Sequence, residues 1–260
     1  MFGMEYELNL ESRLWIPRNL KDSTYFEINY SFSLPLMVEN PDYEEFPYHF
    51  IGSCFLINRN GKTYVVTAKH CIEDTKTNPN NLFVLRNLRS RECLPLCHSY
   101  SPKEIRFEGQ ILNDKNQLDF IIYEVEQNPF KDFYPLAYEN KEMYLHNEGE
   151  PLFNLSYPFI HNSIDYGINK IKLRQRFYKG TYNKKEDDFT HLVQFENENE
   201  SLNGASGSPV LVGIPGDFKL TGILTRDDEK NLTGIAAYLD VVLVGLAIDQ
   251  HDPQNNSLTE

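Results

Sequence analysis

The sequence contains no long apolar run, few cysteines and a deficit of basic side chains. No stretch approaches the roughly 20 apolar residues that a membrane-spanning helix requires, so we expect no membrane partner. The opening Met-Phe-Gly-Met-Glu-Tyr-Glu has neither the basic nor the apolar segment of a secretory signal, which favours a cytoplasmic protein. The 25 Lys and Arg residues are outnumbered by 38 Asp and Glu residues, which gives a net charge of −13. Because phosphate binding needs a basic face, this balance argues against nucleic acid as a partner.

The four cysteines are too few for the disulfide framework of a small secreted domain. Cys93 and Cys97 are separated by three residues, and His98 follows the second of them. No second pair of such ligands lies nearby, so this group favours structural thiols over a metal centre. We expect the protein to act without a metal or other cofactor.

Tyr and Phe are abundant, with 16 and 17 copies, and Ala is scarce, a composition that favours strands over helices. Residues 48–57 and 63–68 predict two strands joined by an Asn-Gly turn. Similar short segments recur along the chain. A chain of 260 residues is long enough for one large core or two small ones.

A glycine-rich heptapeptide at residues 203–209, Asn-Gly-Ala-Ser-Gly-Ser-Pro, stands directly before the apolar run Val-Leu-Val. Gly204 and Gly207 allow positive φ angles around Ser206, so the backbone can turn sharply and aim two N–H groups at one point. That arrangement suits a nucleophile beside an oxyanion hole. On its own the same composition is also that of an ordinary turn.

Two upstream segments add the partners that such a nucleophile needs. The β-branched segment 64–72 ends in Thr-Ala-Lys-His-Cys, which contains His70, and segment 117–123 places Asp119 before another apolar run. A serine hydroxyl needs a nearby base, for which His is suited, and an acceptor on the far ring nitrogen fixes the tautomer. Asp114 lies in a polar loop, where aspartates usually cap turns. The remaining histidines lie in no motif, although His191 is close enough to the serine loop to line a pocket.

These three motifs resemble those of the trypsin/chymotrypsin-like serine peptidases, T-A-A-H-C, D-[IL]-A-L-L and G-D-S-G-G-P. Here they read T-A-K-H-C, D-F-I-I and G-A-S-G-S-P in the same order, each with one or two departures. The resemblance covers residues 51 to 240 and implies an all-β fold of two six-stranded antiparallel β-barrels with a short C-terminal helix. It divides the chain into an extension (1–45), a first barrel with His70 and Asp119 (46–130), a second barrel with Ser206 (131–250) and a tail (251–260).

The resemblance also assigns roles around the triad. The backbone N–H groups of Gly204 and Ser206 would form the oxyanion hole, and Ala205 replaces the acid that pairs with a new N-terminus in zymogens. We therefore expect a site formed by folding alone. In secreted relatives the cysteine that follows the catalytic histidine is bridged to a position near Gly52, so a bridge between Cys54 and Cys71 stays open. The substrate-binding positions fall on Glu200, Ser201, Thr225, Arg226, Asp227 and Gly234.

The preference for the residue before the scissile bond stays open as well. An acid at Glu200 favours Arg or Lys, whereas pairing of Arg226 with Glu200 would neutralise the pocket; the acidic stretch 196–200 is equally typical of a solvated loop. The sequence favours an intracellular serine endopeptidase with a polypeptide substrate and a regulatory protein partner, in a setting such as stress or phage defence. The competing class is a binding module that keeps the fold without activity, for which Ala205 and Ser208 are the supporting departures.

Overall fold

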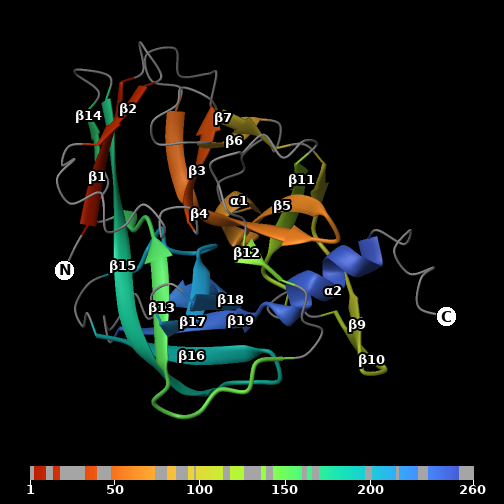
Figure 1. Cartoon of the computed structure of the whole chain (residues 1–260). Helices are drawn as coiled ribbons and strands as arrows, with labels where there is room; N and C mark the ends of the chain where they lie inside the picture. The colour runs from red at the N-terminus through yellow and green to blue at the C-terminus, as the bar shows by residue number, and fades with distance from the viewer. Residues whose placement is uncertain are drawn as a thin grey trace.

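In the computed structural model the chain folds into two large β-sheets and a C-terminal helix (Figure 1). The structure describes residues 3–9, 14–17, 33–39, 48–73, 81–85, 93–96, 98–113, 118–125, 136–138, 143–159, 163–165, 170–196, 201–214, 217–227 and 234–251. Strands dominate these residues, which confirms the predicted all-β fold. No helix in these ranges is long and apolar enough to cross a membrane.

The second half of the chain forms a closed six-stranded barrel. Its strands follow the order β13-β17-β18-β19-β16-β15, and a further pairing of β13 with β15 closes the ring. Their bounds are β13 (Pro151–Ser156), β15 (Lys170–Lys185), β16 (Thr190–Phe195), β17 (Pro209–Ile214), β18 (Asp217–Asp227) and β19 (Ile235–Asp240). The long strand β15 extends beyond the barrel and also pairs with β1 (Gly3–Asn9) and with β14 (Ser163–Asp165). Strand β2 (Leu14–Pro17) pairs with β1.

The first half forms an open half-barrel with the strand order β7-β6-β3-β4-β5-β11-β8. The bounds are β3 (Leu34–Glu39), β4 (Tyr48–Arg59), β5 (Lys62–Thr67), β6 (Leu82–Leu85), β7 (Cys93–Pro95), β8 (Ser99–Tyr100) and β11 (Ile121–Val125). Strands β9 (Ile105–Phe107) and β10 (Gln110–Leu112) pair with each other, and β12 (Leu136–Ala137) runs parallel to β4. Because β3 pairs with both β4 and β6, this sheet begins at Leu34, inside the range expected to be an extension.

The β4–β5 hairpin leads to the segment that contains His70. Asn60 and Gly61 have φ angles of 53° and 76°, as the predicted Asn-Gly turn requires. Strand β5 ends at Thr67, and the short helix α1 (His70–Glu73) starts three residues later. The hairpin thus fixes the position of His70 relative to the sheet.

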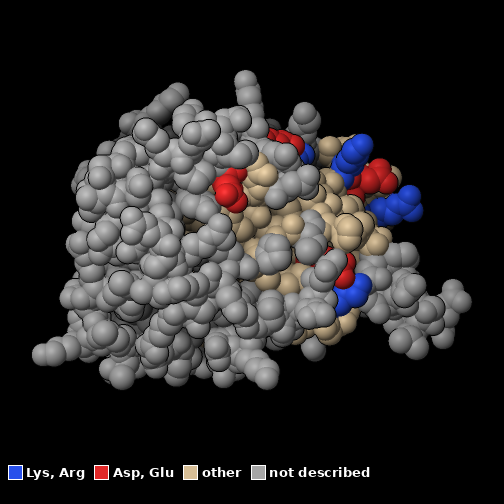
Figure 2. Space-filling view, turned by 90° about the horizontal axis from the view of Figure 1, so that it is seen from above, with Lys and Arg blue, Asp and Glu red and all other residues tan. Residues whose placement is uncertain are grey.

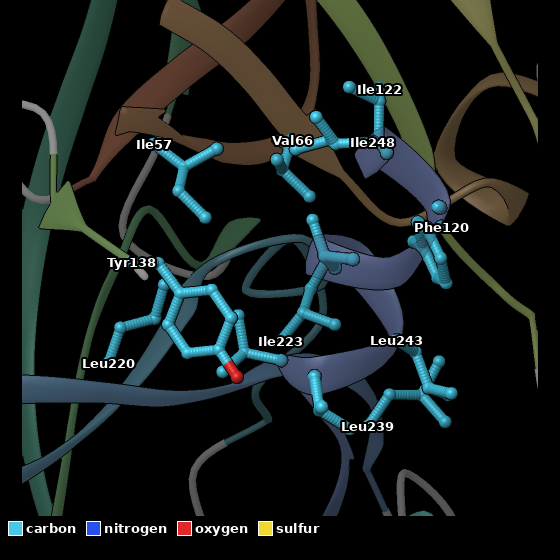
Figure 3. Packing of buried hydrophobic residues seen from close by; sticks show 14 of the residues in the cluster. Ile57, Val66, Phe120, Ile122, Tyr138, Leu220, Ile223, Leu239, Leu243 and Ile248 are labelled. Carbon is cyan, nitrogen blue, oxygen red and sulfur yellow. The ribbon is translucent and has the colours of Figure 1, made fainter. Parts of the chain in front are cut away.

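The C-terminal helix α2 (Val242–His251) packs between the two sheets (Figure 3). Its apolar residues share one cluster with residues of both sheets, including Ile57, Val66, Ile223 and Leu239. Asp240 Oδ1 accepts the Val242 N–H at 2.8 Å and caps the start of the helix. Arg59, 4% exposed, holds its far end through two hydrogen bonds to the Asp249 carboxylate, of 2.6 and 2.8 Å. The two sheets and α2 therefore pack around one shared apolar cluster.

Candidate active site

His70 and Asp119 are joined by two hydrogen bonds. His70 Nδ1 lies 2.6 Å from Asp119 Oδ2, and the His70 backbone N–H donates to Asp119 Oδ1 over 3.0 Å. The pairing of β11 with β5, in which Ile121 is opposite Thr67, brings the two residues together. An acceptor at Nδ1 keeps the proton on that nitrogen and leaves Nε2 as the basic atom.

The serine loop is fastened to the first sheet through Ser53. The Ser53 N–H donates to the Ser206 carbonyl over 3.0 Å, and Ser53 Oγ donates to the Gly204 carbonyl over 3.0 Å. Gly207 has a φ of 84°, and a Cβ at this position would lie 2.2 Å from the Ser53 carbonyl oxygen. The half-barrel sheet and the closed barrel both contribute to the site, and these contacts fix the serine of the closed barrel relative to the histidine of the half-barrel sheet.

The two backbone N–H groups expected to form the oxyanion hole are not engaged within the described part of the chain. Neither Gly204 nor Ser206 donates its N–H to an acceptor among the described residues, whereas the Ala205 N–H donates to the Leu202 carbonyl at 2.7 Å. Gly204 has a φ of 89°. The Ala205 side chain is fully buried and apolar.

Ser208, the other serine of the loop, has a structural role. Its Oγ donates to the Ala205 carbonyl at 2.6 Å and accepts a hydrogen bond from Asn154 Nδ2 at 2.6 Å. It is fully buried, so its hydroxyl braces the loop. Ser206 is therefore the serine of this loop that is available for chemistry.

Ser206 and His70 do not hydrogen-bond to each other in this structure. Ser206 Oγ donates to the Thr225 carbonyl over 3.3 Å, and His70 Nε2 lies 3.7 Å from Cys71 Sγ. The thiol also lies 3.8 Å from the Ser206 carbonyl oxygen. Catalytic hydrogen bonds are often long or misaligned without substrate, so the missing contact is compatible with a substrate-free catalytic site.

The surroundings of His70 shift its pKa in opposite directions. Burial by itself lowers the pKa, but the hydrogen bonds to Asp119 and Cys71 and their charges outweigh burial and raise the pKa of His70 to about 10. The imidazole side chain is 35% exposed and the Asp119 side chain 22%. Because a protonated imidazole cannot accept a proton, the contacts that raise the pKa of His70 oppose any action of this side chain as a general base.

The disulfide left open by the sequence is not formed. Neither Cys54 nor Cys71 is bridged, and Cys54 Sγ instead lies 3.5 Å from the Leu34 carbonyl oxygen in the core of the first sheet. Gly52 faces Cys71: a Cβ at Gly52 would lie 2.9 Å from Cys71 Sγ. A glycine thus occupies the place from which a bridging partner would reach this thiol.

An open pocket of about 370 Å³ is lined in part by His70 and Asp119. Of the predicted substrate-binding residues, Thr225 and Arg226 line it. Arg226 forms an ion pair with Glu186. Glu200 lies outside the described residues, as does the Asp227 side chain. Sequence reasoning did not single out the other residues along its wall, which are Lys69, Glu73, Asp187, Thr190 and Leu239.

Asp187 is the least expected member of this pocket, because it lies in a mixed-charge run that predicts a solvated loop. Its Oδ1 accepts the N–H groups of Phe189 and Thr190 at 2.9 and 2.8 Å, which turns the chain back toward the site. Burial alone would raise its pKa, but these hydrogen bonds outweigh burial and hold the pKa of Asp187 below its usual value. Ser201 and Gly234 do not line this pocket; Ser201 Oγ accepts the Asn203 N–H, and the Gly234 carbonyl accepts the Phe195 N–H.

A second carboxylate–histidine–hydroxyl group lies inside the second barrel. His146 Nδ1 lies 2.8 Å from Glu150 Oε2, and Nε2 lies 2.9 Å from both Thr221 Oγ1 and the Tyr238 hydroxyl. Thr221 is fully buried, so no substrate reaches this group and we assign it a structural role. His191, which the sequence places near the serine loop, is buried beside this group. Within the described ranges no three His, Cys, Asp or Glu side chains form a metal-binding group.

Comparisons with known proteins identify the family. The model of the trypsin-like peptidase domain matches residues 52–214, more than half of the chain. Solved structures with the same chymotrypsin-like fold include human heparin binding protein (TM-score 0.59, 13% identity, 85% of this chain and 91% of that chain covered). Another is the scabies mite inactivated protease paralogue S-I1 (TM-score 0.55, 13% identity, 91% and 99% covered). No curated protein matches the sequence. The family match, the double-sheet fold and the three motifs in order together place the chain in the trypsin-like peptidase family.

Proposed function

We propose that the protein is a serine endopeptidase that cleaves peptide bonds through an acyl-enzyme formed on Ser206. The observation that carries this proposal is the double hydrogen bond between His70 and Asp119, next to a glycine-flanked serine that is docked on the same sheet. A buried structural histidine would not need an exposed ring edge, yet His70 is one-third exposed and lines an open pocket.

Each residue has a defined task in this mechanism. When substrate binds, the Ser206 hydroxyl leaves the Thr225 carbonyl and passes its proton to His70 Nε2 as its oxygen attacks the peptide carbonyl. Asp119 keeps the Nδ1 proton in place and stabilises the imidazolium. The N–H groups of Gly204 and Ser206 bind the developing oxyanion, an effect worth roughly 3 to 4 kcal/mol per donor in such sites. His70 then protonates the leaving amine, and water releases the acyl group by the same route.

The buried Ala205 supports activity without proteolytic activation. A carboxylate at this position would be the partner of a newly exposed N-terminus, and alanine offers no charge for such a pair. Basic and acidic side chains stand next to one another on the described part of one face (Figure 2), with no continuous basic patch there. These features favour a polypeptide substrate and regulated intracellular processing of specific proteins, with a protein partner that restrains the enzyme.

The test is labelling of the full-length chain with a fluorophosphonate, followed by identification of the modified residue. We expect Ser206 to be labelled in the untrimmed protein. Ser206→Ala, His70→Ala and Asp119→Asn should each lower peptide hydrolysis by several orders of magnitude while the protein still folds, and the losses should not add because the three act as one unit. Undiminished hydrolysis by Ser206→Ala would remove the assignment, and labelling that needs prior trimming would remove the activation-free site.

The second candidate function is an inactive binding module. It is favoured by the absence of a hydrogen bond between Ser206 Oγ and His70 Nε2, and by the solved relative whose title reads inactivated protease paralogue. The intact triad residues and the paired His70 and Asp119 weigh against it. A folded protein that resists fluorophosphonate across the pH range in which His70 loses its proton would support this candidate.

A further inference from the structure

We propose that Cys71 Sγ and His70 Nε2 together bind a borderline-soft divalent cation of the Zn²⁺ class, and that the bound cation switches the peptidase off. The binding half of the proposal stands on the geometry of the two side chains alone. The inhibition half rests on the proposed function, because it assumes that Nε2 is the base.

The separation of the two atoms matches a metal chelate. Zinc binds thiolate sulfur at about 2.3 Å and imidazole nitrogen at about 2.0–2.1 Å, so a tetrahedral angle at the metal places sulfur and nitrogen about 3.6 Å apart. Cys71 Sγ and His70 Nε2 lie 3.7 Å apart in this structure. Both ligands are therefore in place, and binding needs little movement of either side chain.

The surroundings of the pair resemble the outer shell of an established zinc site. A histidine that ligates a metal usually donates its other ring N–H to a carboxylate, which fixes the ring and strengthens the ligand. Asp119 Oδ2 makes that contact with His70 Nδ1 at 2.6 Å, and Asp119 Oδ1 also holds the His70 backbone N–H. The nitrogen that faces the thiol is thus already oriented, and it offers its lone pair to a metal once its proton is released.

The thiol is available as a ligand because of the residue opposite it. Cys71 is unbridged, and Gly52 offers no sulfur with which it could pair. Cys71 is only 7% exposed, whereas the His70 side chain is 35% exposed, so a cation reaches the pair through the imidazole. Two protein ligands leave the remaining positions to water, which makes an open, reversible site rather than a structural one.

Binding replaces protons by a metal. The Cys71 thiol and the protonated His70 ring each release one proton to solvent when they bond to the divalent cation, so two protons leave and the net charge of the site stays the same. The same lone pair must accept the Ser206 proton in catalysis. Metal binding and proton transfer therefore exclude each other, and inhibition should weaken as the pH falls and protons compete for both ligands.

The binding test uses Co²⁺ as a spectroscopic probe on the full-length chain. A cobalt ion bound to a thiolate shows a sulfur-to-metal charge-transfer absorption that a nitrogen or oxygen site lacks. We expect this band to saturate in the wild type and to vanish in Cys71→Ser, and Asp119→Asn should weaken binding roughly 10- to 100-fold. The double variant Cys93→Ser/Cys97→Ser controls for the other cysteine pair and should keep the band.

The activity test is independent of that spectrum. Zn²⁺ should inhibit wild-type hydrolysis reversibly on chelation, and the half-inhibiting concentration in Cys71→Ser, measured against that variant's own metal-free rate, should rise at least about tenfold. Cys71→Ala should behave like Cys71→Ser and guards against a new hydroxyl ligand. If the protein hydrolyses nothing, the proposed function fails, yet the cobalt band still tests the site. No band in the wild type, or a band that survives Cys71→Ser, would overturn the metal site.

Discussion

Gly207→Ala should separate the serine loop from the sheet that carries His70. Gly207 has a φ of 84°. A Cβ atom added at Gly207 would lie 2.2 Å from the Ser53 carbonyl oxygen, 2.3 Å from Thr67 Oγ1 and 2.8 Å from the Ala68 backbone nitrogen. Thr67 Oγ1 itself donates to the Ser53 carbonyl over 2.8 Å, so the methyl group would collide with both ends of one hydrogen bond. Backbone atoms form two of the three contacts, and they cannot rotate away.

The expected cost has two parts. Holding a non-glycine residue in the left-handed region costs about 1–2 kcal/mol. Inserting a methyl group into a packed interface adds about 1–3 kcal/mol, because the surrounding backbone must shift. The free energy of unfolding should therefore fall by about 2–5 kcal/mol, out of the roughly 5–15 kcal/mol that is usual for a folded protein.

Gly61→Ala is the matched control. Gly61 has a φ of 76°, and nothing lies within 4 Å of its Cβ position, so the substitution adds only the backbone cost of about 1–2 kcal/mol. Urea unfolding measures both losses, and peptide hydrolysis measures whether the serine loop has moved. We expect Gly207→Ala to lose more stability and far more activity than Gly61→Ala. Equal losses would show that the loop does not need its close approach to the first sheet.

Two further predictions concern charge. The raised pKa of His70 means that its ion pair with Asp119 stabilises the fold fully below the unfolded pKa of about 6.5, and that this stability is lost as the pH rises through about 10. Urea unfolding from pH 6 to 10 should show this decline in the wild type and a flatter profile in Asp119→Asn; parallel profiles would contradict the ion pair. Arg226→Ala should increase cleavage after Lys or Arg and decrease cleavage after Asp or Glu. The pocket then keeps the Asp187 carboxylate without the Arg226 guanidinium. Peptide-library profiling decides this, and an unchanged preference would show that Arg226 does not face the substrate.

The elements that the sequence predicts best are those with strong local chemistry. The Asn-Gly turn fixes two positive φ angles, so the β4–β5 hairpin and the position of His70 follow from a few residues. An aspartate directly before an apolar strand is typical of a side chain held at a sheet edge, and Asp119 lies there. The short C-terminal helix that the family resemblance implies forms at residues 242–251.

Features that depend on distant pairing could not be predicted in this way. Strand β3 reads as an isolated apolar segment broken by Pro35, and only its two neighbours in the sheet explain its burial. Asp187 belongs to a run of charges that suggests solvent, yet two backbone hydrogen bonds turn it toward the pocket. His146 looks like a surface residue in a polar segment, and its role appears only when Thr221 and Tyr238 converge on it.

The contact between Cys71 and His70 depends on Gly52, a residue outside the three motifs. Cys71 itself belongs to the T-A-K-H-C motif, but the neighbouring sequence does not indicate whether it forms a disulfide. The position from which a disulfide partner would reach Cys71 lies on β4. Gly52 occupies it, provides no sulfur, and leaves room for the Cys71 thiol beside His70 Nε2. In the proposed cation site, this one small residue leaves Cys71 as a ligand beside His70 Nε2 in place of a disulfide. Gly52→Ala would test this directly, since its methyl group at 2.9 Å from Sγ must push the thiol away from its present place, and the cobalt band should weaken while Asp119 still holds the imidazole.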